Sequence, residues 1–189
     1  MKLRNALALA AVLAAPLAHA HTGAHSHFDL FAGLSHPLSG ADHLLAMLAV
    51  GIWGAMLGGA ARLALPASFV LAMLLGGVAG HLGMPLPAIE TGIALSVLAL
   101  GLLVSLSVRM PTVLAMALTA GFAVFHGFAH GVEAPADGSF WLYGAGFAVA
   151  TAALHAAGFT LNQHLTSTAR RVLGAGVAAT GGLLLSGVL

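Results

Sequence analysis

The sequence HPLSGADH, residues 36–43, runs directly into an apolar segment at 44–57 and decides the fold class. It places two histidines and one aspartate at the beginning of a segment that has the length of a membrane span. Hydrocarbon strongly disfavours ionisable side chains, so those at or inside a span mark a functional site by default. The stretch therefore indicates a membrane protein whose function depends on histidine and carboxylate groups.

The composition indicates an all-α, polytopic membrane protein. Of the 189 residues, 60% are hydrophobic and only 6% are charged, and the mean hydropathy is +1.02. A water-soluble domain of this length does not need so much apolar surface. Cysteine is absent, which excludes disulfides, iron–sulfur clusters and thiolate metal sites. Without cysteine, the expected metal ligands are nitrogen and oxygen atoms. Histidine is unusually frequent, since its eleven copies equal in number all Asp, Glu, Lys and Arg residues together.

The first twenty residues have the pattern of a cleaved signal peptide. Lys2 and Arg4 precede a short apolar stretch, and AHA at 18–20 fits the small-x-small pattern of a cleavage site. The alternative is an uncleaved first span, but about thirteen apolar residues are too few to cross a bilayer comfortably. We therefore expect removal of residues 1–20. The remaining chain, 21–189, has no lysine and so no Walker-type phosphate loop for ATP.

Six apolar segments follow, each close to the ~20 residues that cross a bilayer. The predicted spans lie at about 40–61, 64–82, 87–108, 111–131, 140–161 and 172–188. Because the connecting loops are short, we expect one compact bundle of six transmembrane helices after the signal peptide. Glycine pairs at four-residue spacing also predict close approach between helices. These pairs are Gly54/Gly58, Gly76/Gly80 and Gly127/Gly131.

The arginines predict the orientation of the bundle. If the signal peptide exports the N-terminus, every second loop is cytoplasmic. The loops assigned to the cytoplasm carry every arginine of the mature chain, namely Arg62, Arg109, Arg170 and Arg171. This distribution follows the positive-inside rule. We therefore predict a bacterial inner-membrane protein whose mature N-terminus and C-terminus are both periplasmic.

The fourth predicted span ends in a second group of ionisable residues. His126, His130 and Glu133 are spaced i, i+4, i+7, which puts them within about 60° on one helix face. The helix dipole disfavours a carboxylate at the C-terminus of a helix, so Glu133 needs a cation nearby. The predicted orientation brings this group to the same membrane face as Asp42 and His43. Imidazole with carboxylate suits divalent first-row ions, and the lack of sulfur ligands argues against copper(I).

Two residues of the first motif also have purely structural interpretations. Ser39-x-x-Asp42 before an apolar run is a capping box, in which Asp42 caps the first span. His36, which precedes Pro37, is compatible with an ordinary beginning of a helix. The sequence alone leaves these interpretations open.

Four further histidines and carboxylates are candidate metal ligands. His21 begins the mature chain, where a histidine-rich arm collects metal or is simply a solvated tail. His81 and Glu90 flank the loop between the second and third spans. His81 has the alternative of a structural role, and Glu90 that of a residue favoured by the helix dipole. His155 in the fifth span is either a second station toward the cytoplasm or a histidine hydrogen-bonded to a neighbouring helix.

The two motifs resemble those of the HupE/UreJ family of nickel/cobalt permeases. HPxxGxDHxxxMxxVG at 36–51 is similar to the family's first motif, and FHGxAHGxE at 125–133 to its second. The signal peptide, the six spans and the small size agree with this resemblance. It implies transport of Ni²⁺ or Co²⁺ for the maturation of hydrogenase or urease. By position, it implies that the essential residues are His36, Asp42, His43, His126, His130 and Glu133.

From these patterns we expect a secondary transporter or facilitator, not an enzyme. Its partners are the divalent metal ion and the lipid bilayer, with no nucleic acid, no ATP and no permanently bound cofactor. One alternative is a metal-binding accessory or sensor protein. Another is a haem-binding redox subunit, although two histidines on one helix face do not suit a six-coordinate haem. An intramembrane metalloprotease is a third, but its His-Glu-x-x-His signature is missing.

Overall fold

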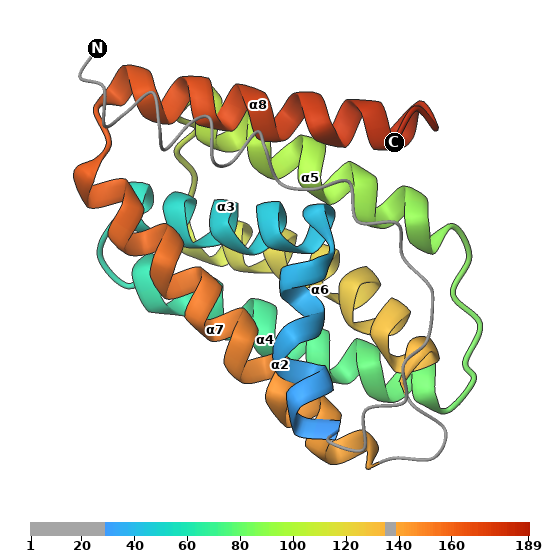
Figure 1. Cartoon of the computed structure of the whole chain (residues 1–189). Helices are drawn as coiled ribbons and strands as arrows, with labels where there is room; N and C mark the ends of the chain where they lie inside the picture. Colours follow the sequence, from blue (N-terminus) through green and yellow to red (C-terminus); the bar gives the residue numbers. More distant parts are fainter. Residues whose placement is uncertain (1–28, 135–138) are drawn as a thin grey trace.

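The computed structural model describes residues 29–134 and 139–189, and these two ranges are helical throughout apart from short connections (Figure 1). The helices are α2 (Asp29–Ser39), α3 (Ala41–Leu57), α4 (Ala61–His81), α5 (Ile89–Ser105), α6 (Thr112–Glu133), α7 (Phe140–His164) and α8 (Ser167–Leu185). The described residues form no β-strand. The all-α class predicted from the composition is therefore confirmed.

Helix α3 occupies the centre of the bundle. It contacts all six other helices of the described chain, and most of its residues are buried, among them Met47, Val50 and Trp53. Around it, the most extensive contacts pair α4 with α6, α5 with α8, and both α2 and α3 with α7. Figure 1 shows α5 and α8 lying side by side along one edge of the bundle. The helix that follows the first motif is thus the one around which the others pack.

The contact between α4 and α6 depends on two of the predicted glycine pairs. A Cβ atom on Gly76 or Gly80 would collide with backbone carbonyl oxygens of α6. One on Gly127 or Gly131 would collide with carbonyl oxygens of α4. Small residues allow membrane helices to approach this closely. The third pair behaves differently, because its Gly58 ends α3 with a φ of 78°, a conformation that favours glycine.

Each of the six predicted segments contains one helix of the structure. α4, α6 and α7 are long and apolar enough to cross a membrane, and α2 with α3 passes the same test only as a pair bent by 86°, which is either a broken span or a re-entrant segment. α5 is apolar but has 17 residues. The helices thus identify a membrane protein, while the count of six spans remains a prediction. The expected signal peptide at 1–20 lies outside the described residues.

Helix α2 was not predicted, and it changes the setting of the first motif. Pro37 lies inside α2, and the chain bends at Gly40, whose backbone is extended. The capping box proposed for Ser39 and Asp42 is wrong. Gly40 is the N-cap of α3 and makes no side-chain cap, while the Ser39 hydroxyl donates to the His36 carbonyl at 2.7 Å. His36 therefore belongs to a separate helix, which the bend turns across the end of α3.

Candidate metal site

Three residues at the end of α2 and α6 have the spacing of metal ligands. His36 Nε2 lies 3.5 Å from Glu133 Oε2, and His130 Nδ1 lies 3.6 Å from the same oxygen. One ligand atom from each residue lies within 4.8 Å of the other two. Bonds from a divalent first-row ion to nitrogen or oxygen are about 2.0–2.2 Å long, so ligand atoms on opposite sides are about 4.2 Å apart. A small inward movement would therefore let the three side chains hold one ion.

Close helix contacts bring α2 to this position. A Cβ atom on Gly33 of α2 would collide with the carbonyl oxygen of Tyr143 in α7. One on Gly146 of α7 would collide with that of Leu30 in α2. Because both helices present glycine at the crossing, α2 lies directly on α7 and holds His36 beside α6.

The three residues continue into a row of buried imidazoles. The ring centroids are 4.7 Å apart for His36 and His130, 4.3 Å for His130 and His43, and 4.5 Å for His43 and His126. The side chains of His36 and Glu133 are 38% exposed, whereas His130 is 5%, His43 7% and His126 0% exposed. The row thus leads from the surface into the bundle. We call six residues the histidine cluster: His36, Asp42, His43, His126, His130 and Glu133.

A hydrogen bond fixes one nitrogen of His43. His43 Nδ1 lies 2.8 Å from Asp42 Oδ1, which also accepts the backbone N–H of His43 at 2.7 Å. A carboxylate only accepts, so we assign the proton to Nδ1, which leaves a lone pair on Nε2. Nε2 is buried without a partner in the described chain. A Cβ atom on Gly40 would lie 2.7 Å from Asp42 Oδ1, so the glycine of the motif leaves room for this pair.

A hydroxyl group orients His126 in the same way. Ser96 Oγ donates to the carbonyl of Ile93 at 2.6 Å and lies 2.7 Å from His126 Nε2. Because the single hydroxyl proton is used by Ile93, we assign the proton of His126 to Nε2 and the lone pair to Nδ1. Nδ1 is buried and makes no hydrogen bond within the described residues. His43 and His126 therefore each keep one nitrogen free to bind a metal.

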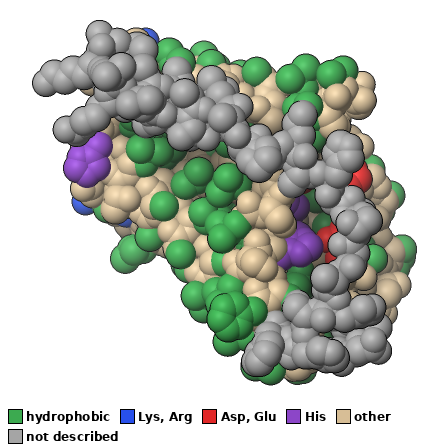
Figure 2. Space-filling model, in the orientation of Figure 1, with side chains coloured by type: hydrophobic (Ala, Val, Ile, Leu, Met, Phe, Trp, Pro, Cys, Tyr) green, Lys and Arg blue, Asp and Glu red, His purple; other side chains and the backbone are tan. Residues whose placement is uncertain are grey.

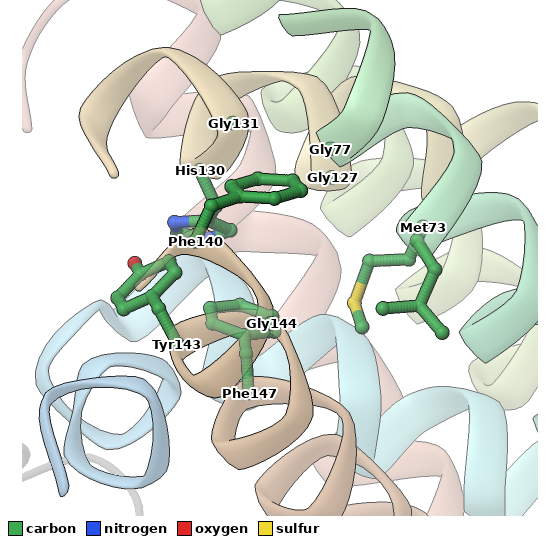
Figure 3. Close-up of a pocket in the computed structure, with 10 residues that line it drawn as sticks. Met73, Gly77, Gly127, His130, Gly131, Phe140, Tyr143, Gly144 and Phe147 are labelled. Carbon is green, nitrogen blue, oxygen red and sulfur yellow. The ribbon is translucent and has the colours of Figure 1, made fainter. Parts of the chain in front are cut away.

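Aromatic side chains of α7 enclose the row on one side. The ring centroid of Phe147 is 4.1 Å from that of His130. Tyr143 is buried, and its hydroxyl has no hydrogen-bond partner among the described residues. His130, Phe140, Tyr143 and Phe147 line one small cavity (Figure 3).

Two of the other candidate ligands, His81 and Glu90, do not join the histidine cluster. His81 is exposed and stacks on Phe140, with ring centroids 4.1 Å apart. Glu90 is exposed in the first turn of α5 and forms no ion pair with any described residue. Their structural interpretations therefore remain open. His21 lies outside the described residues.

His155 lies beyond the inner end of the row, separated from it by Phe69. The Phe69 ring is 5.8 Å from the ring of His126 and 5.2 Å from that of His155. His155 is 2% exposed, and neither of its ring nitrogens has a partner in the described chain. The expected alternative, a hydrogen bond to a neighbouring helix, is therefore not found.

Sequence reasoning missed the residues that support the histidines. Ser96 and Phe69 lie in apolar helices that carry no motif, and both look like ordinary interior residues. A single serine in an apolar span, such as Ser96, indicates a functional role only once the helix that faces it is known. Tyr143 and Phe147 of α7 were missed for the same reason, because periodicity does not predict which helix faces which.

The fold and the histidine cluster define a helical membrane protein with a candidate site for a metal ion. A profile of the family described as "HupE / UreJ protein" matches residues 9–184, so the chain belongs to the HupE/UreJ family. It is 46% identical over 183 residues to Protein HupE of Rhizobium leguminosarum bv. viciae, and the alignment covers 95% of each chain. No solved structure is significantly similar. The resemblance seen in the two motifs is thereby confirmed.

Proposed function

We propose that this protein is a secondary permease or facilitator that imports Ni²⁺, or Co²⁺, across the bacterial inner membrane. The metal would supply the maturation of an enzyme such as hydrogenase or urease. Membership of the HupE/UreJ family, which is associated with nickel and cobalt uptake, supports this function. The observation that carries it is the continuous row of imidazoles leading from the half-exposed His36 to the fully buried His126.

The route begins at the exposed end of the row. His36, His130 and Glu133 capture the ion and replace part of its hydration shell. The free lone pairs of His43 and His126 then take over in turn, since neighbouring rings are only 4.3–4.5 Å apart. Neutral imidazoles suit this role, because a transport site must bind firmly enough to replace water and weakly enough to release. His155 would be the next station, beyond Phe69.

Uptake by the isolated protein is the decisive test. Proteoliposomes that contain only this chain should accumulate radioactive nickel, and the double variant His43→Ala/His130→Ala should not. His164→Ala is the matched control, because His164 is exposed and makes no contact with the histidine cluster. Undiminished uptake by the double variant would overturn the proposal. Protein that binds nickel but moves none would instead be a metal-binding accessory or sensor.

The proposed orientation can be tested with little background, because the chain has no cysteine. Met84 and Arg171 are both exposed, and the positive-inside rule puts them on opposite sides of the membrane. In intact spheroplasts, an impermeant thiol reagent should label Met84→Cys at once. It should label Arg171→Cys only after the membrane is permeabilised. The reverse pattern would invert the route.

A further inference from the structure

A polar cavity of about 230 Å³ lies at the end of the bundle that carries Arg62, Arg109, Arg170 and Arg171, here called the arginine end. The end of α3, the connection between α5 and α6, the end of α7 and the start of α8 all contribute to its wall. Its polar lining consists of Ser107, Arg109, Asn162 and Arg170. Figure 2 shows arginine side chains at one side of the molecule and the acidic side chains at the other, with histidines on both sides.

No carboxylate in the described part of the chain pairs with the arginines around this cavity. Every ion pair in the described part of the chain joins a histidine to Asp42 or Glu133, so neither Arg109 nor Arg170 is paired with a carboxylate. Arg170 Nη1 donates to Asn162 Oδ1 at 3.0 Å, while its Nε is buried and has no partner within 29–134 and 139–189. Buried donors are normally satisfied. Two guanidinium groups and an unused buried N–H therefore line a cavity that has no carboxylate among its lining residues.

The wall of the cavity is held in place by hydrogen bonds. The indole N–H of Trp53, a fully buried residue of α3, donates to the carbonyl of Val108 at 3.0 Å. The N–H of Val108 in turn donates to the carbonyl of Leu103 at 3.0 Å. These bonds fix the segment next to Arg109 against the centre of the bundle.

From this arrangement we infer that the cavity binds the phosphate group of an anionic ligand. The planar guanidinium group matches the oxygens of a phosphate, and Arg is the preferred residue for such recognition. Large apolar side chains at the same end, Leu63 and Leu106, are 80% and 69% exposed. A phospholipid would fit both features, with its phosphate in the cavity and its acyl chains along the apolar surface. This site is separate from the histidine cluster and does not depend on metal transport.

Native mass spectrometry of the purified full-length protein tests the inference. The protein in neutral detergent is titrated with phosphatidylglycerol, with phosphatidylcholine and with inorganic phosphate. We expect the wild type to bind one phosphatidylglycerol and to prefer it over phosphatidylcholine. Arg109→Gln and Arg170→Gln should each weaken this binding at least tenfold. Arg171→Gln is the matched control, because Arg171 is the exposed neighbour of Arg170, outside the cavity wall.

The two sources of phosphate give different results. If inorganic phosphate displaces the lipid in the wild type, the cavity accepts free phosphate as well. If phosphate has no effect on lipid binding, the lipid is the ligand. The inference is overturned if Arg171→Gln weakens binding as much as Arg170→Gln, or if neither ligand binds more tightly than phosphatidylcholine. Should Arg170→Gln lose helical circular dichroism, Arg109→Gln decides, because Arg109 is an exposed loop residue.

Discussion

The two ends of the bundle differ in whether their basic side chains are paired with carboxylates. At the histidine cluster, each described ion pair forms between a histidine and Asp42 or Glu133, and His43, His126 and His130 are buried. At the arginine end, no arginine of the described chain is paired with a carboxylate, and Arg62, Arg109 and Arg171 are exposed.

This difference follows from the chemistry of the two side chains. A neutral imidazole can be buried and offers a lone pair, so it can serve as a ligand inside the bundle. A guanidinium group stays charged and offers only donors, so it stays near water or binds an anion. The protein thus concentrates possible cation ligands at one end and anion ligands at the other.

The largest effect should follow from removal of His130, which contacts both the exposed residues and the buried rings of the row. We expect His130→Ala to lower nickel uptake by about 100-fold or more, because it removes a proposed metal ligand, and even the residues that support a ligand are typically worth about 10–100-fold. Arg171→Gln, at the other end, should stay within about twofold of wild type. Equal losses in the two variants would mean that the ends are not functionally distinct. Initial rates in proteoliposomes measure both.

A smaller effect is expected from Asp42→Asn. The amide keeps the size of the side chain but removes the negative charge that stabilises His43 as a ligand. Because a residue behind a metal ligand typically contributes about 10–100-fold to affinity, nickel binding in detergent should weaken by that amount. Calorimetric titration checks this, and circular dichroism confirms the fold. An unchanged affinity would show that Asp42 has a structural role alone.

The sequence predicted the positions of six of the seven described helices and which motif residues lie together. Apolar segments of membrane length predicted where six of the described helices lie, because the helix is the only simple way to satisfy backbone groups in lipid. The spacing of His126, His130 and Glu133 predicted one shared helix face, and the structure brings two of them, His130 and Glu133, to within 3.6 Å. The arginine pattern predicted that Asp42 and His43 lie at the same end of the bundle as His126 and His130. In the structure, the ring of His43 contacts the rings of His126 and His130.

Tertiary structure decided the rest. Ser39-x-x-Asp42 favoured a cap at the start of the first span, but contacts between α2 and α7 make residues 29–39 a helix. No local pattern predicts the resulting 86° bend. The cavity at the arginine end was missed because it combines loop and helix ends that are far apart in the sequence. Ser96 was missed because its role depends on which helix lies opposite.

Packing between α4 and α6 should affect the stability of the bundle more than it affects metal binding at the histidine cluster or ligand binding at the arginine end. A methyl group on Gly127 would collide with the backbone of Met73, whereas one on Gly121 of the same helix meets nothing within 4 Å. We expect Gly127→Ala to lower the free energy of unfolding by about 1–3 kcal/mol, as overpacking does. Gly121→Ala should be neutral or stabilising by up to about 1 kcal/mol, since alanine favours the helix. Unfolding in sodium dodecyl sulfate compares them, and equal stabilities would contradict the close contact.

The smallest effect should come from Ser96→Ala, which tests how the innermost histidine of the row is oriented. The variant removes the acceptor of His126 Nε2, so the ring can place its proton on either nitrogen. A neutral hydroxyl holds the ring less strongly than a carboxylate does, because charge-assisted hydrogen bonds are roughly twice as strong. Uptake should therefore fall by about tenfold or less, and by less than the uptake of Asp42→Asn measured in the same proteoliposome assay. Ser105→Ala, the same change in the same helix but with no contact to the histidine cluster, should have no effect. If Ser96→Ala instead costs more than Asp42→Asn, transfer to His126 limits uptake, and the buried end of the row controls transport rather than its exposed end.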